Sequence, residues 1–318
     1  MKGEFGLIAR HFTRPVRRAA LGAGDDCALL QPAAGQQLAV SSDMLVEGRH
    51  FLSTVPPARL GHKALAVNLS DLAACGAEPL AFTLALALPR LDDDFLAGFA
   101  KGLFALADAH DIELVGGDTT AGPLNICITV FGQVPPGAAL LRSGAQAGDE
   151  LWVSGRLGDA RLALEAFRGQ VALGADFEHL RLAMEMPQPR VALGLALRGV
   201  ASSAIDISDG LTGDLGHVLQ RSGVGATIDI DALPRSAVLA AQAAALQHEC
   251  LLAGGDDYEL LFTATPGHRD AVLAAASQAG VNATCIGRID LQPGLRVLDA
   301  SGRPVPGRWH GFDHFAAL

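Results

Sequence analysis

Aspartates recur along this chain at the apparent ends of apolar segments, each close to glycine, serine or threonine. The stations are Gly24-Asp25-Asp26, Ser41-Ser42-Asp43, Asn68-Leu69-Ser70-Asp71, Gly116-Gly117-Asp118-Thr119, Asp206-Ile207-Ser208-Asp209-Gly210 and Gly254-Gly255-Asp256-Asp257. Carboxylates repel one another, so a fold that gathers them needs positive charge, and the only lysines are Lys2, Lys63 and Lys101. Divalent cations with oxygen ligands supply that charge, and Mg²⁺ commonly holds a phosphate at the same time. The pattern therefore predicts an enzyme that uses Mg²⁺ and a phosphate-bearing substrate.

The overall charge argues against a nucleic-acid partner. The 318 residues include 24 Lys and Arg against 34 Asp and Glu, a formal net charge of -10. Binding to a nucleic-acid backbone depends on Lys and Arg contacts to phosphates, so we expect no such partner. Small phosphorylated substrates remain compatible with this charge if metal ions neutralise them locally.

The composition indicates a globular protein with a large core. Half of the residues are hydrophobic and 18% are charged, and the length suffices for two domains of ordinary size. No apolar run reaches the roughly 18 residues that span a bilayer, and residues 1–5 lack the features of a signal peptide. We therefore expect a cytoplasmic protein that does not contact a membrane. The five cysteines form no CxxC pair and are expected to be buried free thiols.

Strand-like and helix-like segments alternate along the whole chain. In the first half, residues 38–42, 80–88, 112–115 and 124–134 are predicted strands, and 58–74 and 92–109 are predicted helices. In the second half, residues 151–153, 204–207, 226–230, 259–264 and 284–289 are predicted strands, and 159–167, 190–198, 210–220 and 268–279 are predicted helices. This alternation is typical of an α/β or α+β protein.

The apolar periodicity lapses once near the middle of the chain. Pro135-Pro136-Gly137 interrupts it, and residues 144–149 prolong the interruption. We place the domain boundary there. The prediction is a first domain at 1–137 and a second, α/β domain at 138–318.

The Gly22-Ala23-Gly24-Asp25-Asp26 segment is no standard phosphate loop. A Walker A loop needs Lys-Ser or Lys-Thr after its last glycine, and this chain has neither. A dinucleotide fingerprint needs a third glycine where Cys27 stands. Each such station alone is explained more simply by an ordinary Gly-Asp turn. The case for metal binding is therefore cumulative.

Two of the aspartates lie in segments that do not favour a lone charge. Asp71 is late in an apolar helix, and Asp206 lies inside the apolar strand Ala204-Ile205-Asp206-Ile207. A buried carboxylate is paired, protonated or bound to metal. Pairing with arginine explains either residue alone, but arginine is scarce around all of these stations.

Three other features have two interpretations each. His50 contacts a substrate or is an ordinary turn histidine. Arg142 follows the Pro-Gly linker and is a phosphate ligand or a solvated loop residue. The aromatic segment at residues 309–315 seals a hydrophobic edge or covers a binding cleft.

The ordered set of motifs strongly resembles the thiamine-monophosphate kinase family, from one end of the chain to the other. The matching residues are Gly3-Glu4-Phe5, Gly24 to Ala28, Ser42 to Val46, His50-Phe51, Ala66 to Asp71, Gly116 to Thr120, Asp206 to Gly210, Gly254 to Leu260 and Gly311 to Phe315. The departures are mild, with Asp256 where Glu is expected and Ala253 where Ser or His is common.

The resemblance implies a fold and an oligomeric state. The family belongs to the aminoimidazole ribonucleotide synthetase-like superfamily. Its architecture has two domains: an N-terminal mixed sheet with helices, which pairs with its copy across a homodimer, and a C-terminal α/β domain.

The resemblance also implies that the domain at 1–137 binds ATP and Mg²⁺ and that the domain at 138–318 completes the nucleotide and substrate site. It further implies a role for each site residue. Mg²⁺ ions would be held by Asp26, Ser41, Ser42, Asp43, Asp71, Asp118, Asp206 and Asp209. ATP would be contacted by Gly117, Asp118, Arg142 and Ser208. Thiamine monophosphate would be contacted by His50, Glu259 and Phe312. Asp26, Asp43, Asp71, Asp118 and Asp209 would be the residues on which catalysis depends.

The implied reaction is the Mg²⁺-dependent transfer of the ATP γ-phosphate to thiamine monophosphate, the last step of thiamine diphosphate biosynthesis. The nucleophile would be a phosphate oxygen that is already ionised, so no general base is needed. The requirement is to bring two anions together in line and to neutralise the transferring group. We expect direct transfer without a phospho-enzyme.

Two alternatives stay open. A sibling enzyme of the superfamily would use ATP with another acceptor. A selenophosphate-forming sibling would need a reactive Cys near the N-terminus, and a carbamoyl-modifying one a C-terminal Cys, whereas this chain ends in Leu318. An acidic metal-binding module would carry its ligands in one short loop, but here they are dispersed.

Overall fold

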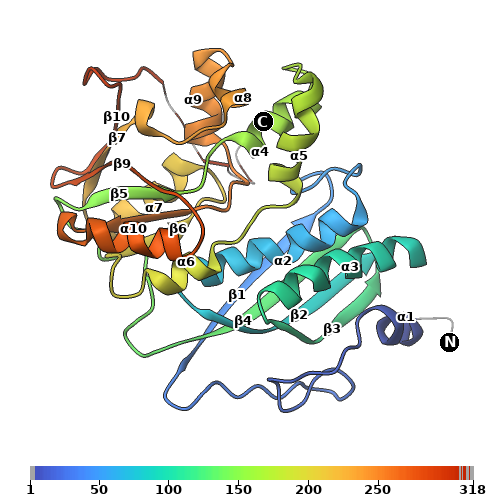
Figure 1. Ribbon diagram of the computed structural model, residues 1–318. Coiled ribbons are helices and arrows are strands. Elements are labelled where there is room, and N and C mark those ends of the chain that lie inside the picture. The colour runs from blue at the N-terminus through green and yellow to red at the C-terminus, as the bar shows by residue number, and fades with distance from the viewer. Residues whose placement is uncertain (1–3, 308, 310, 313–314, 316–318) are drawn as a thin grey trace. The chain divides into compact units, whose positions relative to one another are not determined.

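The chain forms two compact units, each with its own β-sheet. The computed structural model describes residues 4–307, 309, 311–312 and 315 (Figure 1). One unit comprises Met1–Leu72 and Ala77–Gly137, and the other comprises Ala73–Gly76 and Ala138–Leu318. In the described part of the chain, no helix is long and apolar enough to cross a membrane.

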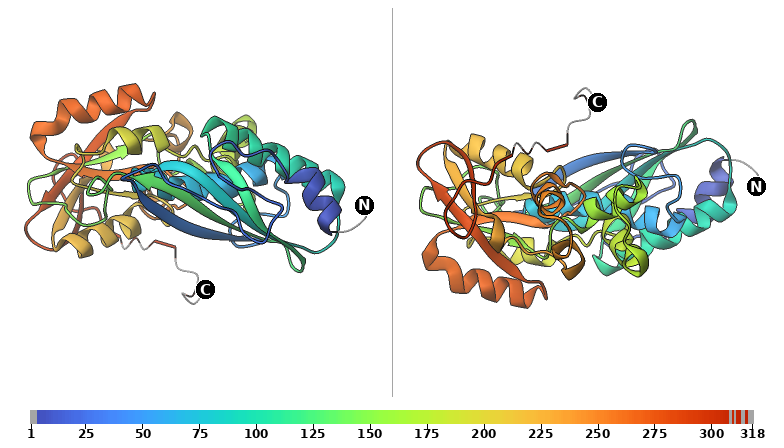
Figure 2. Two further views of the ribbon diagram at one scale, coloured as in Figure 1. Left: turned by 90° about the horizontal axis from the view of Figure 1, so that it is seen from below. Right: turned by 90° about the horizontal axis from the view of Figure 1, so that it is seen from above.

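The first unit is a mixed sheet with two long helices on one face. The strand order is β1-β4-β2-β3, with β2 and β3 parallel and the other neighbours antiparallel. Figures 1 and 2 show α2 and α3 on the same face of this sheet. The elements are α1 (Glu4–His11), β1 (Gln37–Val46), α2 (Pro57–Ala74), β2 (Glu78–Leu88), α3 (Asp93–Ala109), β3 (Glu113–Ala121) and β4 (Asn125–Val134).

The two helices approach each other closely because glycine stands where they meet. A Cβ added at Gly102 would lie 1.7 Å from the carbonyl oxygen of Ala58, and one at Gly61 would lie 2.0 Å from that of Phe99. Any side chain at these positions would push α2 and α3 apart. From Phe82 to Leu88, buried residues of β2 alternate with more exposed ones, as expected where a sheet has one covered face.

The opposite face of the sheet is exposed at the edge strand β1. Leu38, Val40 and Met44 are 45%, 56% and 54% exposed in the single chain. They alternate with Ser41 and Asp43, which are on the face toward α2. Exposed apolar residues in a row are unusual for a surface that meets only water.

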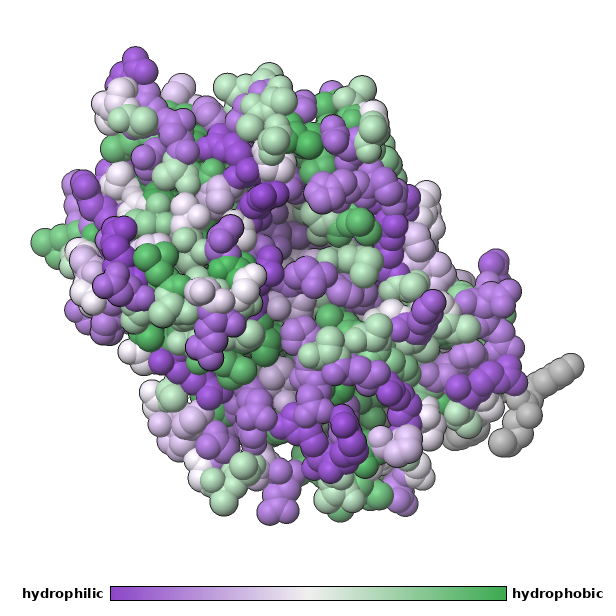
Figure 3. Space-filling model, viewed as in Figure 1, coloured by the Kyte–Doolittle hydropathy of each residue, from purple (hydrophilic) through white to green (hydrophobic). Residues whose placement is uncertain are grey.

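The segment between α1 and β1 packs along the other end of the sheet. Val16, Ala19, Ala28 and Leu30 contact a small cluster formed by Leu80, Ala81 and Val115. Arginines on and after α1 pair with acids of the first unit: Arg10 with Asp93, Arg14 with Asp108, Arg17 with Asp111 and Arg18 with Glu78. Figure 3 shows hydrophilic side chains gathered along this edge of the first unit.

The second unit has a six-stranded sheet in the order β10-β7-β9-β5-β8-β6, in which only β10 and β7 are parallel neighbours. Its strands are β5 (Glu150–Ser154), β6 (Ser203–Asp206), β7 (Gly225–Asp229), β8 (Leu260–Ala264), β9 (Ala283–Asp290) and β10 (Gly294–Leu298). Its helices are α4 (Asp159–Phe167), α5 (Phe177–Glu185), α6 (Val191–Ala196), α7 (Leu211–Ser222), α8 (Ala237–Ala240), α9 (Ala244–Ala253) and α10 (Arg269–Gln278).

The predicted strands and helices are present, with three corrections. Asp43 and Asp118 were expected just after strands, but they lie inside β1 and β3, paired with Ile128 and Ala85. The helices α1 and α5 and the strand β10 were not predicted. The cysteines are free, as expected, but only Cys250 is buried and Cys27 is exposed.

Candidate active site

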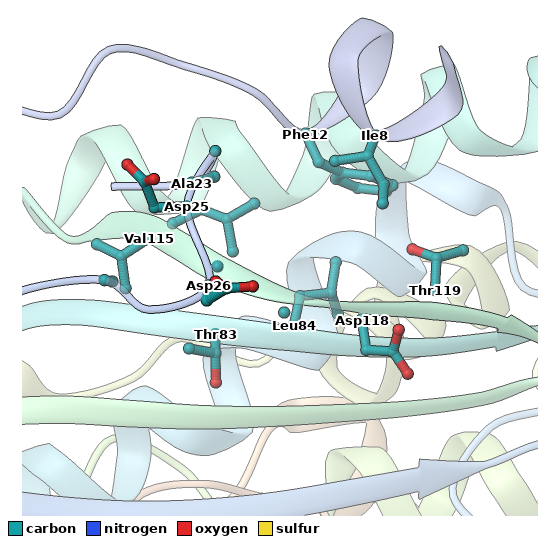
Figure 4. A pocket seen from close by; sticks show the side chains of 15 residues that line it. Ile8, Phe12, Ala23, Asp25, Asp26, Thr83, Leu84, Val115, Asp118 and Thr119 are labelled. Atoms are coloured by element: carbon teal, nitrogen blue, oxygen red, sulfur yellow. The ribbon is translucent and has the colours of Figure 1, made fainter. Parts of the chain in front are cut away.

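A pocket in the first unit brings together two of the predicted acids. Its volume is about 580 Å³. Figure 4 shows Asp26 in the turn after Ala23, Asp118 on β3, Ile8 on α1 and Phe12 directly after that helix. The pocket is lined by Ile8, Phe12, residues 23–26, Ala28, Thr83, Leu84 and residues 114–119. Apolar side chains therefore line one part of the pocket and carboxylates another.

Glycine is required at one point of this pocket. Gly117 has a φ of 150°, and a Cβ there would lie 1.9 Å from the carbonyl oxygen of Leu84. The strand β3 thus passes close to β2 and presents bare backbone beside Asp118. Bare backbone of this kind lets a phosphate approach N–H groups closely.

A second group of predicted ligands lies where β1 faces α2. The Ser41 hydroxyl donates to a carboxylate oxygen of Asp71 at 2.5 Å. The backbone N–H of Asp43 donates to the Asn68 side-chain oxygen at 3.0 Å. Asp71 is therefore turned toward the strand that carries Ser41 and Asp43, and the helix prediction for this station is confirmed.

Ser42 and His50 are placed differently from these residues. The Ser42 hydroxyl lies 2.9 Å from that of Thr129 and donates to the carbonyl of Ile128 at 3.1 Å, which places it on the other face of the sheet. Nδ1 of His50 accepts from the N–H of Val46 at 2.9 Å. A neutral His50 ring then carries its proton on Nε2.

In the second unit, the turn after β6 carries the remaining predicted metal ligands. Asp206 is at the buried end of β6, and Ser208 and Asp209 lie in the turn before α7. The backbone N–H groups of Ser208, Asp209 and Gly210 each donate to one carboxylate oxygen of Asp214, all at 3.1 Å. Burial, and next the negative charge of Asp209, raise the pKa of Asp214 to about 7 in spite of these donors.

Arg142 lines a hollow of about 400 Å³ together with His217, Gln220 and Arg221 of α7. The loop that carries Arg142 is tied to the end of α7, because the Ser222 hydroxyl donates to the Arg142 carbonyl at 3.4 Å. The hollow is cationic, which suits an anionic ligand.

Glu259 is buried and engaged by other protein groups. Arg190 donates to its two oxygens from Nε and Nη2 at 2.6 and 2.5 Å, and the Ser154 hydroxyl donates at 2.5 Å. The side chain of Glu259 is 6% exposed. Its predicted contact with thiamine monophosphate remains a prediction.

The C-terminal segment docks on the turn before α7. The N–H of Phe312 donates to the Asp209 carbonyl at 2.9 Å, and the Thr212 hydroxyl donates to the Trp309 carbonyl at 3.2 Å. Phe312 is 51% exposed. Gly3, His310, Asp313 and His314 of the predicted motifs lie outside the described residues.

The predicted ligands fit Mg²⁺ in kind, since all of them are carboxylates or hydroxyls. Among the residues that the structure describes, no group of three or more His, Cys, Asp or Glu side chains is already assembled around one point. The metal roles of Asp26, Ser41, Ser42, Asp43, Asp71, Asp118, Asp206 and Asp209 remain predictions.

The comparisons with known proteins cover both units. Models of the AIR synthase related protein match residues 24–134 with the N-terminal domain and residues 146–299 with the C-terminal domain. The thiamine-monophosphate kinase of Salmonella typhimurium is 48% identical over 99% of this chain and 98% of its own length. The chain belongs to the thiamine-monophosphate kinase family.

Solved structures agree with this membership and confirm the expected two-domain architecture. The crystal structure of thiamine-monophosphate kinase from Stenotrophomonas maltophilia is 48% identical, with a TM-score of 0.85, and the match covers 95% of this chain and 96% of that one. The structure of AaThiL complexed with AMPPCP and TMP is 29% identical, with a TM-score of 0.76, and the match covers 90% and 89%.

Two residues that contact the predicted site residues were missed from the sequence. The sequence contains a weak indication of Asp214, because it is an acid in the first turn of a helix that follows Ser-Asp-Gly. It contains no indication of Arg190, because the partner of Arg190, Glu259, is 69 residues away in the chain.

Proposed function

We propose that this chain transfers the γ-phosphoryl group of ATP directly to the phosphate of thiamine monophosphate, with the help of Mg²⁺, and forms thiamine diphosphate and ADP. The 48% identity to thiamine-monophosphate kinases over nearly the whole chain carries this proposal. The relative with a solved complex contains AMPPCP and TMP. Mg²⁺, when bound, would neutralise the charge of the phosphates.

The roles of this chain's residues follow from their chemistry. Asp26 and Asp118 in the pocket, and Asp71 beside Ser41, supply hard oxygen ligands for cations. The bare backbone at Gly117 and the cationic hollow at Arg142 suit the phosphates of ATP. Phe312 offers an exposed ring suited to a cationic aromatic substrate.

The attacking group needs no deprotonation by the protein. A phosphate monoester is ionised near neutral pH, so a phosphate oxygen of thiamine monophosphate is already a nucleophile. The work of the site is to hold two anions in line and to offset their repulsion. We therefore assign no residue as general base.

We also propose that the chain works as a homodimer. The exposed row of Leu38, Val40 and Met44 on the open sheet face supports this, because a second copy would cover it. Sedimentation equilibrium of the purified protein should give twice the mass of one chain. A monomer mass at micromolar concentration would rule the dimer out.

The deciding assay incubates the purified protein with ATP, Mg²⁺ and thiamine monophosphate. We expect equal amounts of thiamine diphosphate and ADP, and no product after chelation of Mg²⁺. ADP without thiamine diphosphate would indicate a sibling activity with another acceptor. A phosphorylated protein that passes its phosphate to the substrate would overturn direct transfer. No nucleotide turnover by folded protein would favour the metal-binding module.

A further inference from the structure

The turn that carries Ser208 and Asp209 is held by a single buried side chain. One oxygen of the Asp214 carboxylate accepts from the three consecutive N–H groups of residues 208–210, each at 3.1 Å. Asp214 is 3% exposed, and it projects from the first turn of α7. Three bonds to one oxygen fix the direction in which each of these peptide groups faces.

Other contacts hold the same turn from the opposite side. The carbonyl of Ser208 accepts from the N–H of Asp256, and the carbonyl of Asp209 accepts from the N–H of Phe312, both at 2.9 Å. Gly210 has a φ of 118°, and an added Cβ would lie 2.9 Å from the backbone of Ala253. The turn therefore has little freedom as long as Asp214 is in place.

We propose that Asp214 is a positioning residue for phosphoryl transfer, which fixes the backbone of Ser208 and Asp209 and so directs their side chains to the nucleotide and its metal ion. The inference rests on the proposed function, in which Ser208 contacts ATP and Asp209 holds Mg²⁺. Small displacements of such ligands matter, since a shift of about 1 Å can reduce turnover about 100-fold.

A purely structural role makes a different prediction. An acid in the first turn of a helix commonly stabilises that helix. If Asp214 did only this, its loss would lower the free energy of unfolding and leave the affinity for ATP and Mg²⁺ unchanged. Kinetic constants therefore separate the two roles.

The test compares Asp214→Ala, which removes the acceptor oxygen, with Asp149→Ala. Asp149 is also 3% exposed, and its carboxylate accepts from the N–H of Gln146 at 3.0 Å and from the Ser202 hydroxyl at 2.6 Å. For Asp214→Ala we expect the KM for ATP and the Mg²⁺ concentration for half-maximal activity to rise about 10- to 100-fold. We expect Asp149→Ala to lower stability and leave both quantities at their wild-type values.

A third variant separates the position of the acceptor from its presence. Asp214→Glu keeps a carboxylate but moves it by one methylene, and we expect it to raise the same two quantities. It also provides the test if Asp214→Ala does not fold. Wild-type constants in either folded variant, or equal changes in Asp149→Ala, would overturn the inference. A wild-type protein that forms no thiamine diphosphate would refute the proposed function instead.

Discussion

In each unit, one buried carboxylate accepts hydrogen bonds from three consecutive backbone N–H groups. In the first unit Glu113 accepts from residues 17–19, with shortest distances of 2.7, 3.0 and 3.3 Å. In the second unit Asp214 accepts from residues 208–210, each at 3.1 Å. The two carboxylates are similarly buried, with residue exposures of 8% and 3%.

The electrostatic surroundings of these two carboxylates are opposite. Burial favours a higher pKa for Glu113, but the N–H groups of Arg18, Arg17 and Ala19 and the charge of Arg17 outweigh it, so the pKa is lowered. For Asp214, burial and the charge of Asp209 outweigh the donors, and the pKa is raised to about 7. The first carboxylate is neutralised by the chain itself. The second is next to another negative charge, which is the arrangement expected where a cation binds.

The largest effect is expected for Asp71→Asn, which tests whether this carboxylate is structural or binds metal. Asp71 accepts from the Ser41 hydroxyl at 2.5 Å, so it could act as a structural carboxylate like Glu113 or as a metal ligand. As a ligand, its loss should reduce turnover about 100-fold or more, equivalent to about 2.7 kcal/mol of transition-state stabilisation. Steady-state kinetics at saturating Mg²⁺ would measure this.

The control for Asp71→Asn is its free energy of unfolding. Asparagine still accepts from Ser41, so the variant should stay within about 1 kcal/mol of the wild type. Wild-type turnover in the folded variant would mean that the metal lies elsewhere. Loss of stability with normal turnover of the folded fraction would mean that Asp71 is a structural carboxylate like Glu113.

Most of the fold could be predicted from periodicity, and its failures have local causes. The strands expected at 38–42 and 112–115 were placed too short, because Ser-Ser-Asp and Gly-Gly-Asp read as turns. In the structure they continue, since β4 pairs with β1 through Asp43 and β2 pairs with β3 through Asp118. Pairing across a sheet is not visible in one strand's sequence.

The residues of the candidate site also divide into those that the sequence reveals and those that it does not. Ser41, Asp43 and Asp71 could be selected from the sequence because polar residues interrupt apolar segments there. Their mutual placement, with Ser41 bonded to Asp71, needed the fold. Arg190 could not be found, because long-range ion pairs such as Arg190 with Glu259 leave no local pattern.

A medium effect is expected for Glu113→Gln. The amide group cannot accept from all three donors, so the free energy of unfolding should fall by about 2 kcal/mol at pH 7. The exposed pair of Arg14 and Asp108 is the matched control, and Asp108→Asn should cost less than about 1 kcal/mol. Equal losses of stability in both variants would mean that the three hydrogen bonds to Glu113 do not stabilise the fold more than an exposed ion pair does.

The pH dependence of Glu113→Gln follows from the lowered pKa. Between the folded and the ordinary pKa, the unfolded state binds more protons, so the contribution of Glu113 to stability rises with pH in that range. It is fully present above the ordinary pKa and is lost as the pH falls through the folded pKa. The stability difference between wild type and variant should therefore shrink on acidification.

The smallest effect on stability is expected for Asp257→Asn, but its pH dependence should have a definite sign. Asp257 resembles Asp214 in one respect, because burial raises its pKa well above the ordinary value. Both of its oxygens accept from the N–H of Gly158, at 2.9 and 3.1 Å. The folded state then binds more protons than the unfolded state, so the wild type should lose stability as the pH rises above about 4. Asparagine resembles the protonated acid, so the variant should lose less stability as the pH rises. Denaturant unfolding from pH 4 to 8 should therefore show that the stability of the variant relative to the wild type increases with pH. For Glu113→Gln the relative stability should decrease with pH. A difference that stays flat, or that changes in the same direction as for Glu113→Gln, would show that burial does not set the charge of carboxylates in this chain.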